Sequence, residues 1–152
     1  MTHTSSNFLK FLHKSNPKKI NYSDIHNLLE KKGYLRLMSI DFSGMSTENF
    51  FTSRLSKDFD YLACSNFFIC NFSDFSFTKS ACIDSSSFIE CFFDKTLFLD
   101  SAYNITFERC FFKDMKFLSR LKECTFKECT FEECSFDDSF LNDCTFTDCT
   151  TL

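Results

Sequence analysis

The chain has 152 residues, with 17 basic and 21 acidic side chains, and therefore a formal net charge of −4. It contains 24 Phe and 10 Cys, but only 2 Gly, 1 Pro and no Trp. So few glycines and prolines argue against a loop-rich fold, and the length suits one domain. The acidic excess disfavours direct binding to nucleic acid, which needs a basic surface.

Residues 1–36 are predicted to form a separate helical cap or arm. The Ser-Ser-Asn run at residues 5–7 can cap a short amphipathic helix that stops before Pro17. Ser23 can cap a second helix that ends at Gly33, and this helix carries apolar side chains on one face: Ile25, Leu28 and Leu29. We expect these helices to cover the open N-terminal end of the domain that follows.

The arm is also basic. It carries seven Lys and Arg against two acidic side chains, so its charge is +5. The alternative interpretation is therefore an amphipathic segment that contacts a membrane surface or a partner. No segment is apolar over enough residues to span a bilayer.

The remaining chain, residues 37–152, shows a repeat of five residues. It is clearest in residues 122–150, where a small residue is followed two positions later by a large apolar one. The small residues are Cys124, Cys129, Cys134, Ser139, Cys144 and Cys149, and the large ones are Phe126, Phe131, Phe136, Leu141 and Phe146. A period of five suits neither a regular helix nor a flat strand. All these rings can share one interior only if the chain turns a corner about every five residues, which is a solenoid.

Three earlier stretches keep the same period, and each is shifted from the next by one residue. Their large residues are Phe107, Phe112 and Phe117; Ile83, Phe88, Phe93, Phe98 and Tyr103; and Leu62, Phe67, Phe72 and Phe77. We interpret the shifts as bulges or altered corners. Leu37 and Phe42 can open the series, and residues 43–59 are predicted to form an irregular coil or an inserted loop.

The repeat unit, as in Cys124-Thr125-Phe126-Lys127-Glu128, resembles that of the pentapeptide repeat family, whose usual unit is Ala-(Asp/Asn)-Leu-x-x. The resemblance covers residues 60–151 and, more weakly, residues 35–59. It implies an all-β solenoid, a right-handed quadrilateral parallel β-helix with a short α-helical N-terminal cap. With about twenty residues per coil, Cys124 would lie over Cys144 and Phe126 over Phe146.

The ten cysteines allow several interpretations. A secreted disulfide scaffold is usually short and loop-rich, and no secretory signal is visible. There is no Cys-x-x-Cys pair, and all three histidines (His3, His13 and His26) lie in the arm, so zinc-ligand spacing is absent. We expect most cysteines to be small residues packed inside the tube, with stacked thiols such as Cys124 and Cys144 at risk of oxidation. No metal and no cofactor are predicted.

The C-terminal region is acidic. Residues 128–152 contain seven acids and no Lys or Arg, and these acids are the predicted partner-binding residues: Glu128, Glu132, Glu133, Asp137, Asp138, Asp143 and Asp148. We expect them at outward positions, with Glu128 next to Asp148 on one face. They either keep the tube soluble or face a basic protein partner.

No phosphate-binding loop, catalytic triad or metalloprotease motif occurs, so an enzyme is not expected. The sequence favours a non-catalytic protein–protein interaction scaffold in the cytoplasm. Some members of the family that it resembles act as bacterial effectors or adaptors inside host cells. Others mimic DNA and protect type II topoisomerases from quinolones, which is the first alternative. The second alternative is a membrane-associated effector that binds through the basic arm. The uncharged C-terminal residues 149–152 also predict an end-to-end homodimer.

Overall fold

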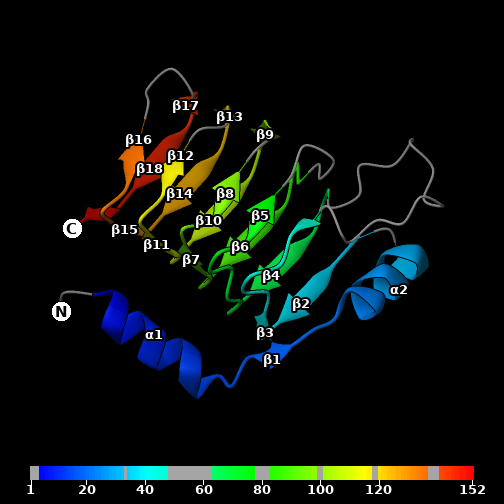
Figure 1. Cartoon of the computed structure of the whole chain (residues 1–152). Helices are drawn as coiled ribbons and strands as arrows, with labels where there is room; N and C mark the ends of the chain where they lie inside the picture. Colours follow the sequence, from blue (N-terminus) through cyan, green and yellow to red (C-terminus); the bar gives the residue numbers. More distant parts are fainter. Residues whose placement is uncertain are drawn as a thin grey trace.

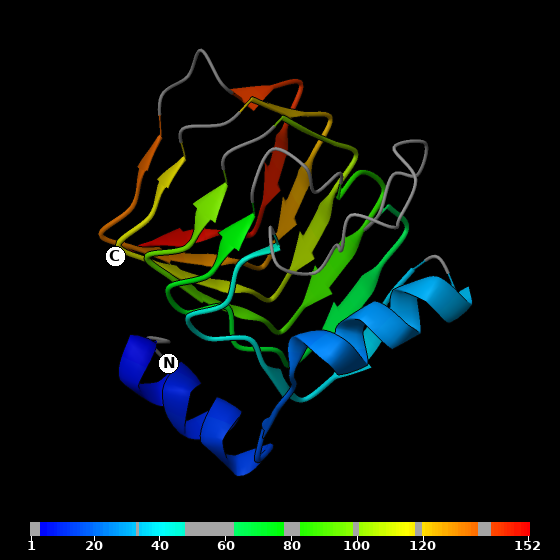
Figure 2. The same cartoon turned by 45° about the vertical axis from the view of Figure 1, so that its right-hand side comes forward.

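The computed structural model describes residues 4–32, 34–47, 63–77, 83–98, 101–117, 120–136 and 141–152. These residues form a parallel β-solenoid of about five turns, with two short helices near the N-terminus, as Figure 1 shows. The predicted all-β solenoid is therefore confirmed. Figure 2 shows the strands arranged around a common axis, with both helices on the outside.

The solenoid has four sides, each a ladder of short parallel strands. The first side contains β2 (Arg36–Met38), β4 (Asn66–Phe68), β6 (Ser87–Ile89), β10 (Thr106–Glu108), β14 (Thr125–Lys127) and β18 (Thr145–Thr147). The second contains β1 (Lys18–Lys19), β3 (Ile40–Asp41), β7 (Phe92–Asp94), β11 (Phe111–Lys113), β15 (Thr130–Glu132) and β19 (Thr150–Thr151). Isolated bridges at Asn71 join β3 to β7 on that side.

The other two sides are built from shorter strands. The third side contains β5 (Ser76–Phe77), β8 (Leu97–Phe98), β12 (Lys116–Phe117) and β16 (Ser135–Phe136). The fourth contains β9 (Ala102–Tyr103), β13 (Leu121–Lys122) and β17 (Leu141–Asn142).

The chain turns most of its corners with residues other than glycine in the left-handed backbone region, and Gly44 is an exception in the first coil. The residues between the first and second sides have φ between 50° and 54°. Ser39 has this place in the first coil, and we call the later ones the corner column: Ile69, Glu90, Arg109, Glu128 and Asp148. Such a backbone is unfavourable for residues with a side chain, and the ladder hydrogen bonds on both sides of each corner hold it there. The side chains of this column consequently point away from the tube at one straight edge.

The phenylalanine rings fill the interior in columns, as the repeat predicted. On the first side, Phe107 stacks between Phe88 and Phe126 with ring centroids 5.2 and 4.9 Å away. On the second side, Phe112 stacks between Phe93 and Phe131 at 4.9 and 5.0 Å. Neighbouring columns meet edge to face, so the core is one continuous aromatic cluster.

The register follows the prediction, with one correction. Phe126 pairs with Phe146, twenty residues away, whereas Phe107 and Phe126 pair at nineteen. The shift lies between the third and fourth sides: Phe117 and Leu121 are four residues apart, whereas their partners in the next coil, Phe136 and Leu141, are five residues apart. Tyr103 was predicted to face inward, but it is 42% exposed, and Ala102 occupies the interior instead. The prediction was wrong because the shift occurs before residue 102 rather than after it.

The two helices have different roles. Helix α2 (Tyr22–Lys32) inserts Ile25 and Leu29 into the core beside Leu35 and Phe42, so it is the predicted cap over the first coil. Its N-terminus is capped by the side chain of Asn21, whose Oδ1 accepts from the N–H of Asp24 at 2.8 Å, not by Ser23. Gly33 and residues 48–59 of the predicted inserted loop lie outside the described residues.

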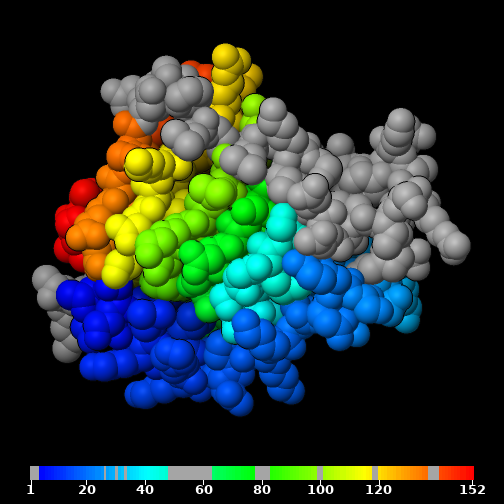
Figure 3. Space-filling model, viewed as in Figure 1, coloured from blue at the N-terminus to red at the C-terminus, as the bar shows by residue number. Residues whose placement is uncertain are grey.

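Helix α1 (Ser5–Lys14) does not cover the end of the solenoid. It lies along the second side, as Figure 3 shows, and its N-cap residue is Thr4, not one of residues 5–7. The prediction that both helices form a lid was therefore wrong for α1. The strand β1 that follows it pairs with β3 and extends the same side by one strand.

Candidate protein-binding groove

Helix α1 is held by aromatic residues on the outer surface of the second side. Phe92 and Phe111 directly precede the inward Phe of their strands, so they point outward. The ring of Phe8 lies 5.8 Å from Phe92 and 5.6 Å from Phe111, and Leu12 is only 2% exposed between the helix and the sheet. In the next coils the equivalent residues are Thr130 and Thr150, so this apolar contact ends there.

A carboxylate fixes the N-terminus of α1. The N–H and the hydroxyl of Ser5 donate to the two oxygens of Glu132 at 3.1 and 2.9 Å, and the Lys113 ammonium lies 3.6 Å away. Desolvation disfavours the charged form of Glu132, but the hydrogen bonds from Ser5 outweigh it, so its pKa is lowered. A negative charge here also suits the helix dipole.

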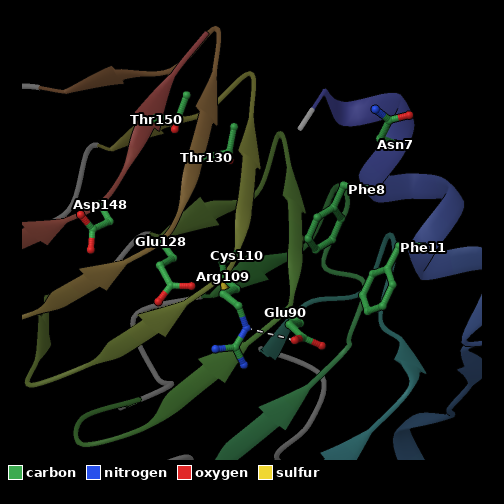
Figure 4. A pocket seen from close by; sticks show the side chains of 10 residues that line it. All are labelled: Asn7, Phe8, Phe11, Glu90, Arg109, Cys110, Glu128, Thr130, Asp148 and Thr150. Atoms are coloured by element: carbon green, nitrogen blue, oxygen red, sulfur yellow. Dashed lines mark hydrogen bonds and ion pairs between the residues drawn. The ribbon is translucent and has the colours of Figure 1, made fainter. Parts of the chain in front are cut away.

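A groove of 710 Å³ runs between α1 and the corner column. One wall is formed by helix residues, which are Asn7, Phe8 and Phe11. The other wall is formed by four members of the corner column, which are Glu90, Arg109, Glu128 and Asp148. Thr130, Thr150 and the buried Cys110 also line it, and Figure 4 shows how these side chains lie.

The charges along this groove are unevenly compensated. Arg109 donates to Glu90 at 3.0 Å and also pairs with Glu108, and the hydrogen bond to Glu90 raises the pKa of Arg109. Lys127 lies 3.3 Å from Glu108 and 3.7 Å from Glu128. Within the described part of the chain, Asp148 forms no salt bridge. The acidic excess is therefore greatest where the groove reaches the last coil.

Glu128 and Asp148 lie one above the other. They directly follow the paired residues Lys127 and Thr147, so they are separated by one strand spacing, about 4.8 Å. The prediction that they share a face agrees with this register. Both residues line the groove together with Phe8 and Phe11, and Figure 4 shows them on the side of the groove that lies away from helix α1.

The other predicted acids lie elsewhere. Glu132 anchors α1, and Glu133 lies at the corner between the second and third sides, where a hydrogen bond with Asp114 raises its pKa. Asp143 lies at the corner between the fourth and first sides. Asp137 and Asp138 are outside the described residues. The described members of the acidic set are thus divided among three corners and the outer surface of the second side, and they do not form a single patch.

The sequence prediction missed the helix wall of the groove and the members of the corner column that precede Glu128. Phe8, Phe11, Glu90 and Arg109 line the groove but were not predicted as site residues. A signal for them was present in the doubled phenylalanines that follow Cys91 and Cys110, because an outward Phe on a solenoid strand requires a cover.

The cysteines follow the packing prediction in most positions. Cys70, Cys91, Cys110, Cys124 and Cys129 are buried, while Cys134, Cys144 and Cys149 are half-buried in the last coils. Cys64 is exposed, and Cys82 lies outside the described residues. Each inward thiol donates to backbone carbonyls, for example Cys110 to Phe88 at 3.2 Å.

No group of three or more metal-ligating side chains suited to a metal ion occurs among the residues that the structure describes. In the same residues, neither helix has the length and apolar character needed to cross a membrane.

No protein-family model matches the chain, and no curated protein matches it either. The resemblance to the pentapeptide repeat family therefore stays a prediction from the repeat itself.

Proposed function

We propose that this protein is a non-catalytic scaffold that binds a basic segment of another protein in the groove between α1 and the corner column. The observation that carries the proposal is the stacked pair Glu128 and Asp148 opposite Phe8 and Phe11. Acids on one wall and aromatic rings on the other form a site of mixed character, open along its length.

The chemistry of the walls favours an Arg-containing segment. A guanidinium presents several N–H donors in one plane, so it can bridge two carboxylates that stand at the same corner on adjacent strands. Its flat face and its methylene groups pack well on aromatic rings such as Phe11, which is 40% exposed. Asp148, which forms no salt bridge among the described residues, gains a partner when such a residue binds.

The groove is also built on rigid elements. Its acidic wall is a corner of the hydrogen-bonded tube, and its aromatic wall is attached through Phe92, Phe111 and Glu132. A preformed site loses little conformational entropy on binding. We therefore propose that the partner orders on binding and that the solenoid changes little.

The resemblance to pentapeptide repeat proteins supports a role as an adaptor or effector, in the cytoplasm of a bacterium or of a host cell. Binding to a membrane through the arm is a weaker candidate. The apolar side chains of α1 pack against Phe92 and Phe111, so the helix must leave the solenoid before it can insert into lipid.

A DNA-mimicking inhibitor of a type II topoisomerase is the second candidate. Regularly spaced acids at three corners of the last coils favour this candidate, because they resemble the regular negative charges of DNA. They are Glu123 with Asp143, Glu128 with Asp148, and Glu133. Lys122 and Lys127 interrupt this charge. A supercoiling assay with gyrase tests this candidate. An inhibitor present in excess over the enzyme must reduce supercoiling, and no effect would remove the candidate.

The groove proposal is tested with the full chain and a labelled peptide that contains Arg and aromatic residues, by fluorescence anisotropy. The double variant Glu128→Gln/Asp148→Asn should weaken binding about tenfold or more, because each charge-assisted hydrogen bond contributes roughly 1.5–3 kcal/mol. The matched control is Glu123→Gln/Asp143→Asn, which removes the same charges at another corner. An equal loss in both variants would show non-specific attraction and contradict the proposal.

A further inference from the structure

One interior column of the solenoid consists only of cysteine after the first coil. In five successive coils the first inward residue of the second side is a cysteine; in chain order these are Cys70, Cys91, Cys110, Cys129 and Cys149. The equivalent residues of the first side are Ser65, Ser86, Ile105, Cys124 and Cys144, and those of the third side include Phe75, Thr96 and Met115. Packing at these positions thus accepts many side chains, and packing alone does not account for an unbroken column of sulfur.

The last two members of the column differ in access. Cys129 is buried, while Cys149 is half-buried in the final coil. The thiols donate to the carbonyl oxygens of Phe107 and Phe126, both at 3.4 Å. Thr130 pairs with Thr150 one residue later, so the two cysteines lie in adjacent strands about 4.8 Å apart, within the Cα separations that disulfides accept.

A disulfide requires Cβ atoms about 3.8 Å apart, so two coils must approach each other by about 1 Å to form one. The coil that carries Cys110 is hydrogen-bonded on both sides and cannot move toward Cys91 without breaking its contacts with the next coil. The final coil is paired on one side among the described residues. The column therefore allows a disulfide at its C-terminal end and resists one in its interior.

We propose that Cys129 and Cys149 form a redox-modifiable pair, which a peroxide converts into a disulfide that joins the last two coils. Hydrogen peroxide first oxidises the accessible Cys149 thiol to a sulfenic acid and is reduced to water. The sulfur of Cys129 then attacks the sulfenic sulfur, its proton leaves with the hydroxyl group as a second water, and the S–S bond forms. Two thiols and one peroxide give one disulfide and two waters.

The order of the two steps agrees with the surroundings of the thiols. A hydrogen bond with Cys110 and burial both raise the pKa of Cys129, so this thiol stays protonated until the final coil moves. Cys149 is the member of the pair that solvent reaches. A small oxidant consequently meets Cys149 first.

The modification bears on the groove, and this consequence rests on the proposed function. Glu128 and Thr130 flank Cys129, Asp148 and Thr150 flank Cys149, and all four flanking residues line the groove. A disulfide behind this wall fixes the distance between the two carboxylates. Binding of the Arg-containing peptide should therefore differ between the reduced and the oxidised protein.

The test treats the reduced full chain with hydrogen peroxide, blocks remaining thiols with a maleimide and digests it without reduction. A protease that cleaves after Glu and Asp separates the two cysteines, because cleavage after Glu128 and Glu132 releases residues 129–132 and cleavage after Asp148 releases residues 149–152. Mass spectrometry should find these two peptides joined, and dithiothreitol should separate them. The Cys149→Ser variant should lack the product, whereas Cys64→Ser, which removes an exposed cysteine, should retain it.

Three results would overturn the proposal: a disulfide between Cys91 and Cys110, a Cys149 joined mainly to another cysteine, or a sulfonic acid at Cys149 without a crosslink. If the disulfide forms but the protein binds no peptide in either redox state, the redox-modifiable pair is supported and only the proposed function is contradicted. The thermal midpoint provides a second measurement. It should rise by several degrees on oxidation in the native chain and stay unchanged in Cys149→Ser.

Discussion

Ser5 and Glu132, 127 residues apart in the sequence, are joined by two hydrogen bonds of 3.1 and 2.9 Å. The bonds connect the first turn of α1 to strand β15, which lies near the opposite end of the solenoid. Helix α1 can take its position only after that coil has formed. The groove is therefore a product of the complete fold, because it needs both the helix and the last two coils.

The attachment of α1 should depend on pH through Glu132. Hydrogen bonds from Ser5 lower the pKa of this carboxyl below its usual 4.5 despite the opposing effect of desolvation. The contribution to stability is thus complete above pH 4.5 and is lost as the pH falls through the lowered folded-state pKa. Hydrogen exchange of the α1 amides should accelerate over that range, with the core strands still protected. Glu132→Gln should remove the pH dependence; an unchanged profile in this variant would contradict the assignment.

Replacement of an outward aromatic residue should release α1. Phe111→Thr introduces the residue type that occupies the same position in the next two coils, at Thr130 and Thr150, so the strand itself tolerates it. The lost contact with Phe8 and Leu12 should cost about 1.5–3 kcal/mol, the value of one large apolar side chain. Amide exchange should increase in α1 and remain slow in β10 and β14. Thr125→Ser, on the outer surface of the first side, is the control and should leave α1 protected.

Truncation of an interior ring should destabilise the whole solenoid. Phe112 is fully buried between Phe93 and Phe131, and Phe112→Ala should lower the free energy of unfolding by roughly 3–5 kcal/mol. Phe146→Ala is the matched control, because that ring is stacked on Phe126 but is 45% exposed. Its effect in denaturant titrations should be clearly smaller. Equal losses at both positions would contradict the difference in burial between the two rings.

The C-terminal end of the solenoid should support self-association. Phe146 and Leu152 are 45% and 44% exposed there, and their coil presents strand edges that can pair. The acids of the same coils repel one another, so we expect two chains to meet end to end mainly at high salt, where that repulsion is screened. Light scattering over a range of concentration and salt measures this. A monomer under all conditions would refute the prediction, and Phe146→Lys should abolish any dimer.

The period of five was sufficient to predict the solenoid, its aromatic core and the stacking of Phe126 on Phe146. These features follow from local spacing, which a sequence displays directly. The exposure of Tyr103 was not predicted, since a shift of one residue can be assigned to either side of a corner. The position of α1 was also missed, because it depends on the contact of Phe8 with Phe92 and Phe111, which are distant in the chain.

The candidate site was predicted only in part, for a similar reason. Acidic residues were recognised by composition, but their corner is decided by the position of each within a repeat unit. Glu128 and Asp148 share a position and come together, whereas Glu132 and Glu133 occupy others and point to different neighbours. Arg109, which interrupts the acids of the corner column, lies outside the acidic segment 128–152 from which the site residues were predicted.

The most direct test of the central claim is a titration of the isotope-labelled full chain with the Arg-containing peptide, followed by NMR. We expect the largest shift changes at Glu128, Thr130, Asp148 and Thr150 and in helix α1, with little change at Asp143 and on the fourth side. Changes centred on the fourth side would contradict a binding groove at this corner. The absence of any change with the peptide in large excess would contradict it as well.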